Sequence, residues 1–377
     1  MNSSILSEIG CLRGSQDFTI DYKNSNRHCI IVREPDSSRT AYCFGTPIYN
    51  KNTKRLVKLS FDETADGFYH IGSSAEVKVS EREIVMKNTE GVLRIHGLCN
   101  YRLYEGRILF PGGEIAPTLN GIAVKMAPVK ENKISLILTT SIPFMETRAN
   151  SKYFAFMSEK FRPFSTLSAI GLLGAGGNLT SPIQIKCQKI NSKSYSVTLS
   201  TFSQIRNPIW FEINMYEPKL FQDTTVESKK TKENNAFGGI AFIGETEAFG
   251  ETWLYTRPDF TKISYLLEKK ARYVKLHLPV YNIGSATLSA YRTAARFCSF
   301  GSNWNNKIEL SKKMIDTAVG NQYQTLDLTD SVINPKNYSI RTTDGFILRI
   351  KEQKKLAVVS TGDSYINPQI LEINYFN

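Results

Sequence analysis

Residues 209–216, Ile-Trp-Phe-Glu-Ile-Asn-Met-Tyr, show most clearly how this chain folds. Apolar side chains occupy every second position, which is the period of a β-strand. One face of this strand would collect Ile209, Phe211, Ile213 and Met215. The other face would carry Trp210, Glu212, Asn214 and Tyr216. Such a division into an apolar face and a largely polar face is typical of an antiparallel sheet with one side in solvent.

The same alternation recurs along the chain and dominates its secondary-structure signal. Further stretches of this kind are 133–139, 183–187, 195–199, 273–280, 346–350 and 371–375. Helical periodicity is limited to short segments at 3–12, 264–271 and 308–317. Because an α/β fold needs a helix after nearly every strand, the sequence predicts an all-β fold. We expect two tandem antiparallel β-sandwich domains of the jelly-roll kind.

A change in composition marks the predicted domain boundary. Residues 226–235 contain a single apolar residue, so we interpret 225–244 as a linker. Residues 50–224 would form a first β-sandwich domain, and residues 245–377 a second one. Residues 1–49 would form a less regular arm or a leading hairpin.

The overall composition is that of a folded protein. Apolar residues make up 41% of the 377 residues and charged residues 22%, which excludes wholesale disorder. No segment approaches the run of about 18 apolar residues that a membrane-spanning helix needs. The first ten residues lack the charged and apolar blocks of a secretory signal. The location is therefore open: particle-associated, at a cell surface by an unconventional route, or cytoplasmic.

The net charge of +12 allows attraction to phosphate or anionic glycans. The basic residues are spread over several stretches, and the densest cluster, Lys229, Lys230 and Lys232, lies between Glu227 and Glu233. Nucleic-acid-binding proteins usually group Lys and Arg on one element. We therefore interpret the charge as a solvated cationic surface and do not expect a nucleic-acid partner.

The six cysteines and four histidines show no metal-ligand spacing. We interpret the cysteines as free, mostly buried thiols, although a bridge between Cys29 and Cys43 stays open. His277 falls on the outward face of its strand, where a solvated surface histidine is expected. We expect no cofactor and no metal site. The alternative is calcium bound by the loop acids Asp62, Glu63 and Asp66, or by Asp327 with Asp330.

Six short motifs follow one another in residues 245–377. They are 272–278 (Arg-Tyr-Val-Lys-Leu-His-Leu), 286–291 (Ala-Thr-Leu-Ser-Ala-Tyr), 304–306 (Trp-Asn-Asn), 325–329 (Thr-Leu-Asp-Leu-Thr) with Val332, 344–348 (Asp-Gly-Phe-Ile-Leu) and 368–375 (Pro-Gln-Ile-Leu-Glu-Ile-Asn-Tyr). Their order resembles the DNRLRE domain family, which is related to disaggregatase proteins. The resemblance implies a jelly-roll sandwich like those of carbohydrate-binding modules, in an extracellular or surface protein. It implies no catalytic residues.

Exposed aromatic side chains are the candidate ligand or interface residues. Trp210 and Tyr216 share the outward face of the strand at 209–216, too far apart to contact one monosaccharide. They would suit an interface between domains or subunits. Trp304, with Asn305 and Asn306, lies in a loop of the second domain. We interpret it as a structural tryptophan beside turn-forming asparagines, with sugar stacking as the alternative.

These observations favour a non-catalytic structural or adhesive protein of a cell surface, an appendage or a phage-like particle. Its partners would be glycans or other subunits, and it could form a homo-oligomer. Rigid sandwiches display loops for recognition, and the sequence shows no active-site motif. One alternative is a polysaccharide-degrading enzyme, a glycoside hydrolase or polysaccharide lyase, with an acid pair in the first β domain. A second is a cationic nucleic-acid-binding module.

Overall fold

The computed structural model describes residues 5–98, 100–127, 133–142, 146–158, 163–174, 179–200, 207–282, 285–341 and 343–376. The chain divides into two compact units. Unit 1 contains residues 1–49, 218–236 and 240–377, and unit 2 contains residues 50–217 and 237–239. The described residues form mostly β-strands in antiparallel sheets, so the predicted all-β class is confirmed.

Unit 2 is built from two antiparallel sheets. The nine-stranded sheet has the order β14-β15-β16-β20-β12-β11-β10-β9, with β17 added to β16. Its strands are β9 (Arg102–Tyr104), β10 (Arg107–Phe110), β11 (Gly113–Pro117), β12 (Gly121–Met126), β14 (Glu146–Ala149), β15 (Tyr153–Met157), β16 (Pro163–Leu173), β17 (Leu179–Ser181) and β20 (Ile209–Met215). The eight-stranded sheet has the order β18-β19-β13-β8-β7-β6-β5-β4. Its strands are β4 (Asp62–Thr64), β5 (Gly67–Ile71), β6 (Glu76–Val79), β7 (Ile84–Lys87), β8 (Val92–His96), β13 (Lys133–Thr140), β18 (Gln184–Asn191) and β19 (Ser194–Ser200).

The core of unit 2 lies between these two sheets, which makes the unit a β-sandwich. Ile209, Phe211, Ile213 and Met215 of β20 are all in this core, as the alternation predicted. The predicted strand at 133–139 likewise sends alternate side chains into the core, since β13 alternates between exposed and buried residues.

The other face of β20 is also buried, and here the prediction of a solvent-facing side was wrong. Trp210 is 7% exposed, and Glu212 and Asn214 are 1% and 0% exposed. Asn214 Nδ2 donates to Glu212 Oε2 at 2.9 Å, and Thr118 Oγ1 donates to Asn214 Oδ1. Hydrogen bonds of this kind let polar side chains be buried without a large desolvation penalty.

Unit 1 also consists of two antiparallel sheets. The six-stranded sheet has the order β1-β2-β3-β30-β24-β27. Its strands are β1 (Thr19–Ile20), β2 (Cys29–Arg33), β3 (Arg39–Phe44), β24 (Lys270–Pro279), β27 (Tyr323–Asp327) and β30 (Ile370–Phe376). The seven-stranded sheet has the order β26-β25-β28-β23-β22-β29, with β21 added to β23. Its strands are β21 (Phe221–Glu227), β22 (Ile240–Thr246), β23 (Gly250–Pro258), β25 (Thr287–Thr293), β26 (Leu310–Ala318), β28 (Phe346–Ile350) and β29 (Leu356–Ser360).

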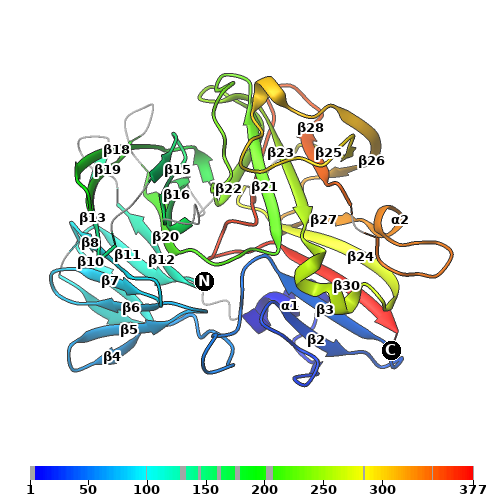
Figure 1. Cartoon of the computed structure of the whole chain (residues 1–377), viewed down its shortest axis with the longest axis horizontal. Coiled ribbons are helices and arrows are strands. Elements are labelled where there is room, and N and C mark those ends of the chain that lie inside the picture. Colours follow the sequence, from blue (N-terminus) through cyan, green and yellow to red (C-terminus); the bar gives the residue numbers. More distant parts are fainter. Residues whose placement is uncertain are drawn as a thin grey trace. The chain divides into compact units, whose positions relative to one another are not determined.

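The first segment of the chain is part of this sandwich. Of the arm or leading hairpin expected at 1–49, the structure has the hairpin, formed by β2 and β3 within the six-stranded sheet. β3 pairs with the C-terminal strand β30, with Ala41 opposite Ile373, and both residues lie in the core between the two sheets of unit 1. Figure 1 shows β2, β3 and β30 side by side. Local periodicity predicts a strand but does not identify its partner, so the sequence could not reveal this long-range pairing.

The predicted linker at 225–244 is a packed connection that overlaps two strands. β21 ends at Glu227 and β22 begins at Ile240. Between them, Asn234 Nδ2 donates to the carbonyl oxygens of Ser299 and Ser302, at 2.6 and 2.8 Å. The polar composition that suggested a linker therefore reflects side chains that bond to the backbone of unit 1.

Helices are few. Helix α1 (Ile5–Arg13) confirms the helical segment expected at 3–12. A 3₁₀ helix, η2 (Phe260–Leu266), partly matches the segment at 264–271, whereas the helix expected at 308–317 is wrong because β26 occupies it. The described residues also form a short helix α2 (Thr329–Val332) and a 3₁₀ turn η3 (Trp304–Asn306). In the part of the chain that the structure describes, no helix has the length and apolar character to cross a membrane.

Helix α1 lies on the face of the six-stranded sheet that points away from the core, which we call the outer face. Ile9 of α1 is 0% exposed. Glu8 accepts a hydrogen bond from the Tyr323 hydroxyl of β27, and Arg13 Nη1 donates to the Tyr42 hydroxyl of β3 at 3.4 Å. Unit 1 therefore covers this outer face with its own N-terminal segment.

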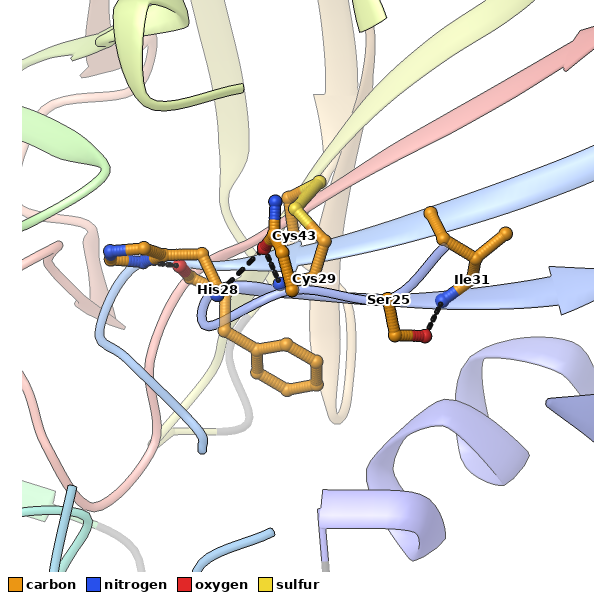
Figure 2. Close-up of a disulfide and its surroundings, with 7 residues drawn as sticks. Ser25, His28, Cys29, Ile31 and Cys43 are labelled. Carbon is orange, nitrogen blue, oxygen red and sulfur yellow. Dashed lines mark hydrogen bonds between the residues drawn. A yellow bond between two sulfur atoms is a disulfide. The ribbon is translucent and has the colours of Figure 1, made fainter. Parts of the chain in front are cut away.

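A disulfide joins β2 to β3, which resolves the open question about Cys29 and Cys43. The two residues lie opposite each other in the ladder, with Cα atoms 4.1 Å apart. Figure 2 shows the bond between their sulfur atoms, beside the hydrogen bond from Ile31 N to Ser25 Oγ. The bridge that the sequence left open is therefore present, whereas the expectation that the free thiols are mostly buried was wrong. Cys11 and Cys298 are free and exposed, Cys187 is free and half-buried, and Cys99 lies outside the described residues.

We predict that loss of the Cys29–Cys43 bond destabilises unit 1. The bond closes a loop with a sequence separation of 14, for which the chain-entropy model gives about 3 kcal/mol. The double substitution Cys29→Ser, Cys43→Ser should lower the guanidinium midpoint of the unfolding transition that includes unit 1. The control is Cys298→Ser, which removes an exposed thiol and should leave that midpoint unchanged. Equal midpoints for the double variant and the unsubstituted chain would contradict the prediction.

Candidate functional site

The outer face of the seven-stranded sheet carries the aromatic residues that best fit a binding site. In β23 and β28, Leu254 and Leu348 point into the core of unit 1. Their neighbours Trp253 and Ile347 point the other way and form a second, smaller cluster. Residues 297–310 cover this cluster, because Phe297, Trp304, Ile308 and Leu310 all pack against it. The sheet therefore places aromatic side chains under a loop at the surface.

The three residues predicted as site candidates in this loop form a rigid turn. Asn303 Oδ1 accepts hydrogen bonds from the backbone N–H groups of Asn305 and Asn306, at 3.0 and 3.3 Å. Asn306 Oδ1 accepts in return from Asn303 N at 2.7 Å, which completes a capping box. Asn306 Nδ2 also donates to the Gly301 carbonyl oxygen at 2.9 Å. Asn306 thus stabilises the turn, whereas Asn305 is exposed at its tip.

Trp304 lies half-buried against Trp253. Their ring centroids are 5.4 Å apart, with an interplanar angle of 61°. Lys307 Nζ lies 4.8 Å from the centroid of Trp304, and the Arg349 guanidinium lies 5.1 Å from that of Trp253. Glu251 Oε1 accepts from Trp253 Nε1 at 2.8 Å and from Arg349 at 3.2 Å. We call Glu251, Trp253, Trp304, Lys307 and Arg349 the tryptophan patch.

The tryptophan patch combines a stacking surface with a positive charge. Each cation–π contact stabilises an exposed site by about 0.5 to 1 kcal/mol, which holds Lys307 and Arg349 near the rings. Two cations and one carboxylate leave a formal charge of +1. Trp304 and Arg349 keep part of their surface accessible, and the side chain of Arg349 is 30% exposed. This arrangement can bind a ligand that presents a flat apolar surface next to a negatively charged group.

The other two predicted candidates, Trp210 and Tyr216, belong to unit 2 and do not join the tryptophan patch. Trp210 is buried, with Lys125 Nζ 5.0 Å from its ring centroid. Tyr216 is half-buried and packs edge-on against Phe237, at 6.2 Å between centroids. The expectation of two exposed rings on one solvated sheet face was therefore wrong, because Trp210 is buried and Tyr216 is half-buried.

His277 is buried, which corrects the expectation of a solvated surface histidine. It is 4% exposed, and its Nε2 lies 2.7 Å from Glu372 Oε2. Its Nδ1 lies 2.9 Å from Thr325 Oγ1. The side chain does point outward from its strand, but Tyr323 of β27 packs edge-on against the imidazole, at 6.2 Å between ring centroids. Burial raises the pKa of Glu372, yet hydrogen bonds from His277 and Tyr273 outweigh it and hold that pKa below its usual range.

An acid pair that sequence reasoning missed lies in unit 1. Asp223 of β21 is 2% exposed, and Gly362 N donates to its Oδ2. Burial, and then the charge of Asp363, raise the pKa of Asp223 well above its usual value. Burial also raises the pKa of Asp363 to about 6, although the charge of Lys219 opposes this. The two aspartates come from distant parts of the sequence, so no local spacing could have indicated the pair.

A second group of acids surrounds a cavity of about 950 Å³ in unit 2. The acids in its lining are Glu63, Asp66, Glu81 and Glu83. Asp66 pairs with Lys78 at 3.3 Å, and Glu83 pairs with Arg94. We call this the acid-lined cavity. Across the described residues, no group of three or more His, Cys, Asp or Glu is arranged to hold a metal ion.

We predict that the acid pair makes unit 1 less stable as the pH rises from about 4 to above 6. The pKa of Asp363 in the folded state is about 6, above the ordinary value of 3.8 for an aspartate, so the folded state binds the proton more tightly across that interval. The stabilisation that unit 1 gains from this tighter proton binding is fully present below pH 4 and is lost as the pH rises through the folded-state pKa. Asp363→Asn should flatten this slope and stabilise unit 1 at pH 7.5 by on the order of 1 to 3 kcal/mol.

Chemical denaturation at several pH values measures this effect. Asp17→Asn is the matched control, because Asp17 is exposed in the same unit. A loss of stability on Asp363→Asn at pH 7.5 would contradict the assignment of a destabilising carboxyl pair.

Comparisons with known proteins identify no family for this chain: no family model matches it, and no curated protein matches it.

Proposed function

We propose that this chain is a non-catalytic adhesive protein that binds acidic glycans through the tryptophan patch. The observation that carries the proposal is the half-buried Trp304 ring, held on Trp253 with Lys307 Nζ 4.8 Å from its centroid. The proposed function requires no cofactor.

Sugar recognition suits this geometry for two reasons. The apolar C–H face of a pyranose can lie on an aromatic ring, and a ring fixed before binding loses little conformational entropy. The capping box at Asn303 and Asn306 fixes the backbone that carries Trp304. The exposed Asn305 side chain, next to Trp304 in the turn, can bond to sugar hydroxyls.

The preference for acidic glycans follows from charge. The tryptophan patch has a formal charge of +1, and the whole chain has a net charge of +12. Long-range attraction raises the association rate with a polyanion, and Lys307 supplies a local contact. A carboxylate or sulfate beside the stacked sugar would pair with Lys307.

The proposed place of action is a cell surface, an appendage or a phage-like particle. The Cys29–Cys43 disulfide supports this, because disulfides persist mainly in oxidising surroundings. The resemblance of residues 245–377 to a carbohydrate-binding type of sandwich supports the same choice.

We predict that Trp304→Ala weakens binding to acidic polysaccharides by about tenfold or more, as expected for an aromatic anchor at the centre of a site. Affinity electrophoresis with hyaluronan, alginate and neutral dextran measures the effect. Lys307→Ala should reduce the dependence of affinity on salt. The matched control is Tyr22→Ala, which removes a 67% exposed aromatic ring of unit 1 outside the tryptophan patch.

Two results would count against this proposal. If Trp304→Ala leaves polysaccharide binding intact but lowers the molar mass in light scattering, the tryptophan patch is an interface between subunits. If duplex DNA binds more tightly than every polysaccharide, with affinity that falls steeply with salt, the chain is a nucleic-acid-binding module.

We also predict that the chain releases no reducing ends and no unsaturated products from these polysaccharides. The acid-lined cavity and the acid pair are the places where a degrading activity would reside. Product formation that is abolished by Glu63→Gln, Glu81→Gln or Asp363→Asn would replace the adhesive function with an enzymatic one.

A further inference from the structure

We infer that a second cavity, on the outer face of the six-stranded sheet, binds a small neutral ligand rich in hydroxyl groups, such as one uncharged sugar residue. This inference goes beyond the proposed function, because it concerns different residues and a ligand without charge. The cavity has a volume of about 420 Å³. That volume falls in the lower part of the range of about 300 to 1,000 Å³ that is typical of small-molecule sites.

Segments from both ends of the chain build this cavity, which we call the α1 cavity. Leu12 and Arg13 at the end of α1 form one side, and the β2–β3 connection, 34–38, forms another. The floor comes from the outward-facing side chains of β3, β24 and β30. These are Tyr42, Arg272, Tyr273, Glu372 and Asn374. All of them belong to unit 1.

Every charged side chain of the α1 cavity already has a partner. Arg13 donates to both carboxylate oxygens of Glu34, at 2.7 and 2.9 Å. Arg272 pairs with Asp36 at 2.6 Å. An ionic ligand would find no uncompensated opposite charge here and would lose its own hydration.

Glu372, the remaining charged group, is also satisfied. Its Oε1 accepts from the Tyr273 hydroxyl at 2.8 Å, and its Oε2 lies 2.7 Å from His277 Nε2. A cationic ligand would therefore compete with two existing hydrogen bonds for this carboxylate.

Asn374 is the group that points to a ligand. Its Nδ2 donates to Ser38 Oγ at 3.2 Å and to Thr40 Oγ1 at 3.0 Å. Both hydroxyls give their own hydrogen to carboxylates, Ser38 to Asp36 and Thr40 to Glu34. The hydroxyls must therefore accept from Asn374, which fixes the orientation of its amide.

The amide oxygen of Asn374 consequently has no hydrogen-bond partner, although the residue is only 3% exposed. A buried acceptor without a partner costs about 1 to 3 kcal/mol, so a ligand that donates to it is favoured. Arg13 Nε is a buried donor without a partner in the same cavity. The Tyr42 hydroxyl accepts from Arg13 at 3.4 Å and keeps its own hydrogen to donate.

The residues that line the α1 cavity thus carry one buried acceptor and one buried donor without partners, the Tyr42 hydroxyl as a second donor, and no free charge. A hydroxyl group can donate and accept at once without carrying charge, so a ligand with several hydroxyls matches these groups. The rings of Tyr42 and Tyr273 add an apolar surface against which a sugar ring can pack.

The test uses the full chain and saturation-transfer NMR with the methyl glycosides of glucose, galactose and mannose. We expect at least one to bind with a Kd of about 1 mM or tighter. Glucosamine and glucuronate, which carry a positive and a negative charge, should bind at least about tenfold more weakly. Failure of all three glycosides to bind at about 50 mM, or tighter binding of either charged sugar, would overturn the inference.

Substitutions locate the binding. Asn374→Leu removes the unpartnered acceptor and should abolish binding, and Tyr42→Phe removes one donor and should weaken it about 3- to 10-fold. Asn374→Leu also removes the donors to Ser38 and Thr40, so its thermal unfolding is compared with that of the unsubstituted chain. If Asn374→Leu does not fold, Tyr42→Phe decides. Unchanged binding in Asn374→Leu, or in Tyr42→Phe if Asn374→Leu does not fold, would overturn the inference.

Tyr22→Ala, which lies outside both sites, is the control and should bind the methyl glycosides as the unsubstituted chain does. Asn305→Leu and Trp304→Ala show at which of the two sites the methyl glycosides bind. Loss of glycoside binding in these two variants would place the neutral sugar at the tryptophan patch and reject the α1 cavity. Acidic polysaccharide binding is measured separately with Trp304→Ala. Failure of the α1 cavity proposal can therefore be distinguished from failure of the proposed function.

Discussion

The antiparallel ladder between β3 and β30 is the interaction on which unit 1 depends. It places a strand from near the start of the chain beside the C-terminal strand, with Tyr42 opposite Glu372 and Thr40 opposite Asn374. Tyr42, Glu372 and Asn374 of these pairs belong to the floor of the α1 cavity. The Cys29–Cys43 bond ties β3 to β2, its neighbour on the side opposite β30. Without this ladder, the core of unit 1 would lose Ala41 and Cys43, and the outer face would lose α1.

Both sheets of unit 1 have an outer face that is partly covered by irregular chain, and this is where the candidate sites arise. α1 covers one of these faces and the loop containing Trp304 covers the other. A sheet face alone is flat and offers few concave places. A segment packed on top creates an edge where side chains from several strands meet a loop, and recognition residues commonly collect at such edges.

Most polar groups buried on these faces have hydrogen-bond partners, and the few without a partner indicate where a ligand could bind. His277 and Glu372 satisfy each other at 2.7 Å, whereas Asn374 retains an acceptor without a partner. The acid pair is a different kind of exception, because two carboxyl groups in a buried setting favour sharing a proton over full ionisation. Such groups reduce stability, and proteins often retain them where they contribute to function.

The sequence alone determined the all-β class and the inward faces of strands such as β20, because a period of two depends only on neighbouring residues. It also indicated α1 and the asparagine turn beside Trp304, which are local structures. The tertiary structure decided that residues 1–49 complete the second sandwich, that His277 and Trp210 are buried, and that Cys29 meets Cys43. It also brought Asp223 to Asp363 and Asn374 to Tyr42. Periodicity shows which side of a strand a residue occupies, but only long-range pairing decides what covers that side.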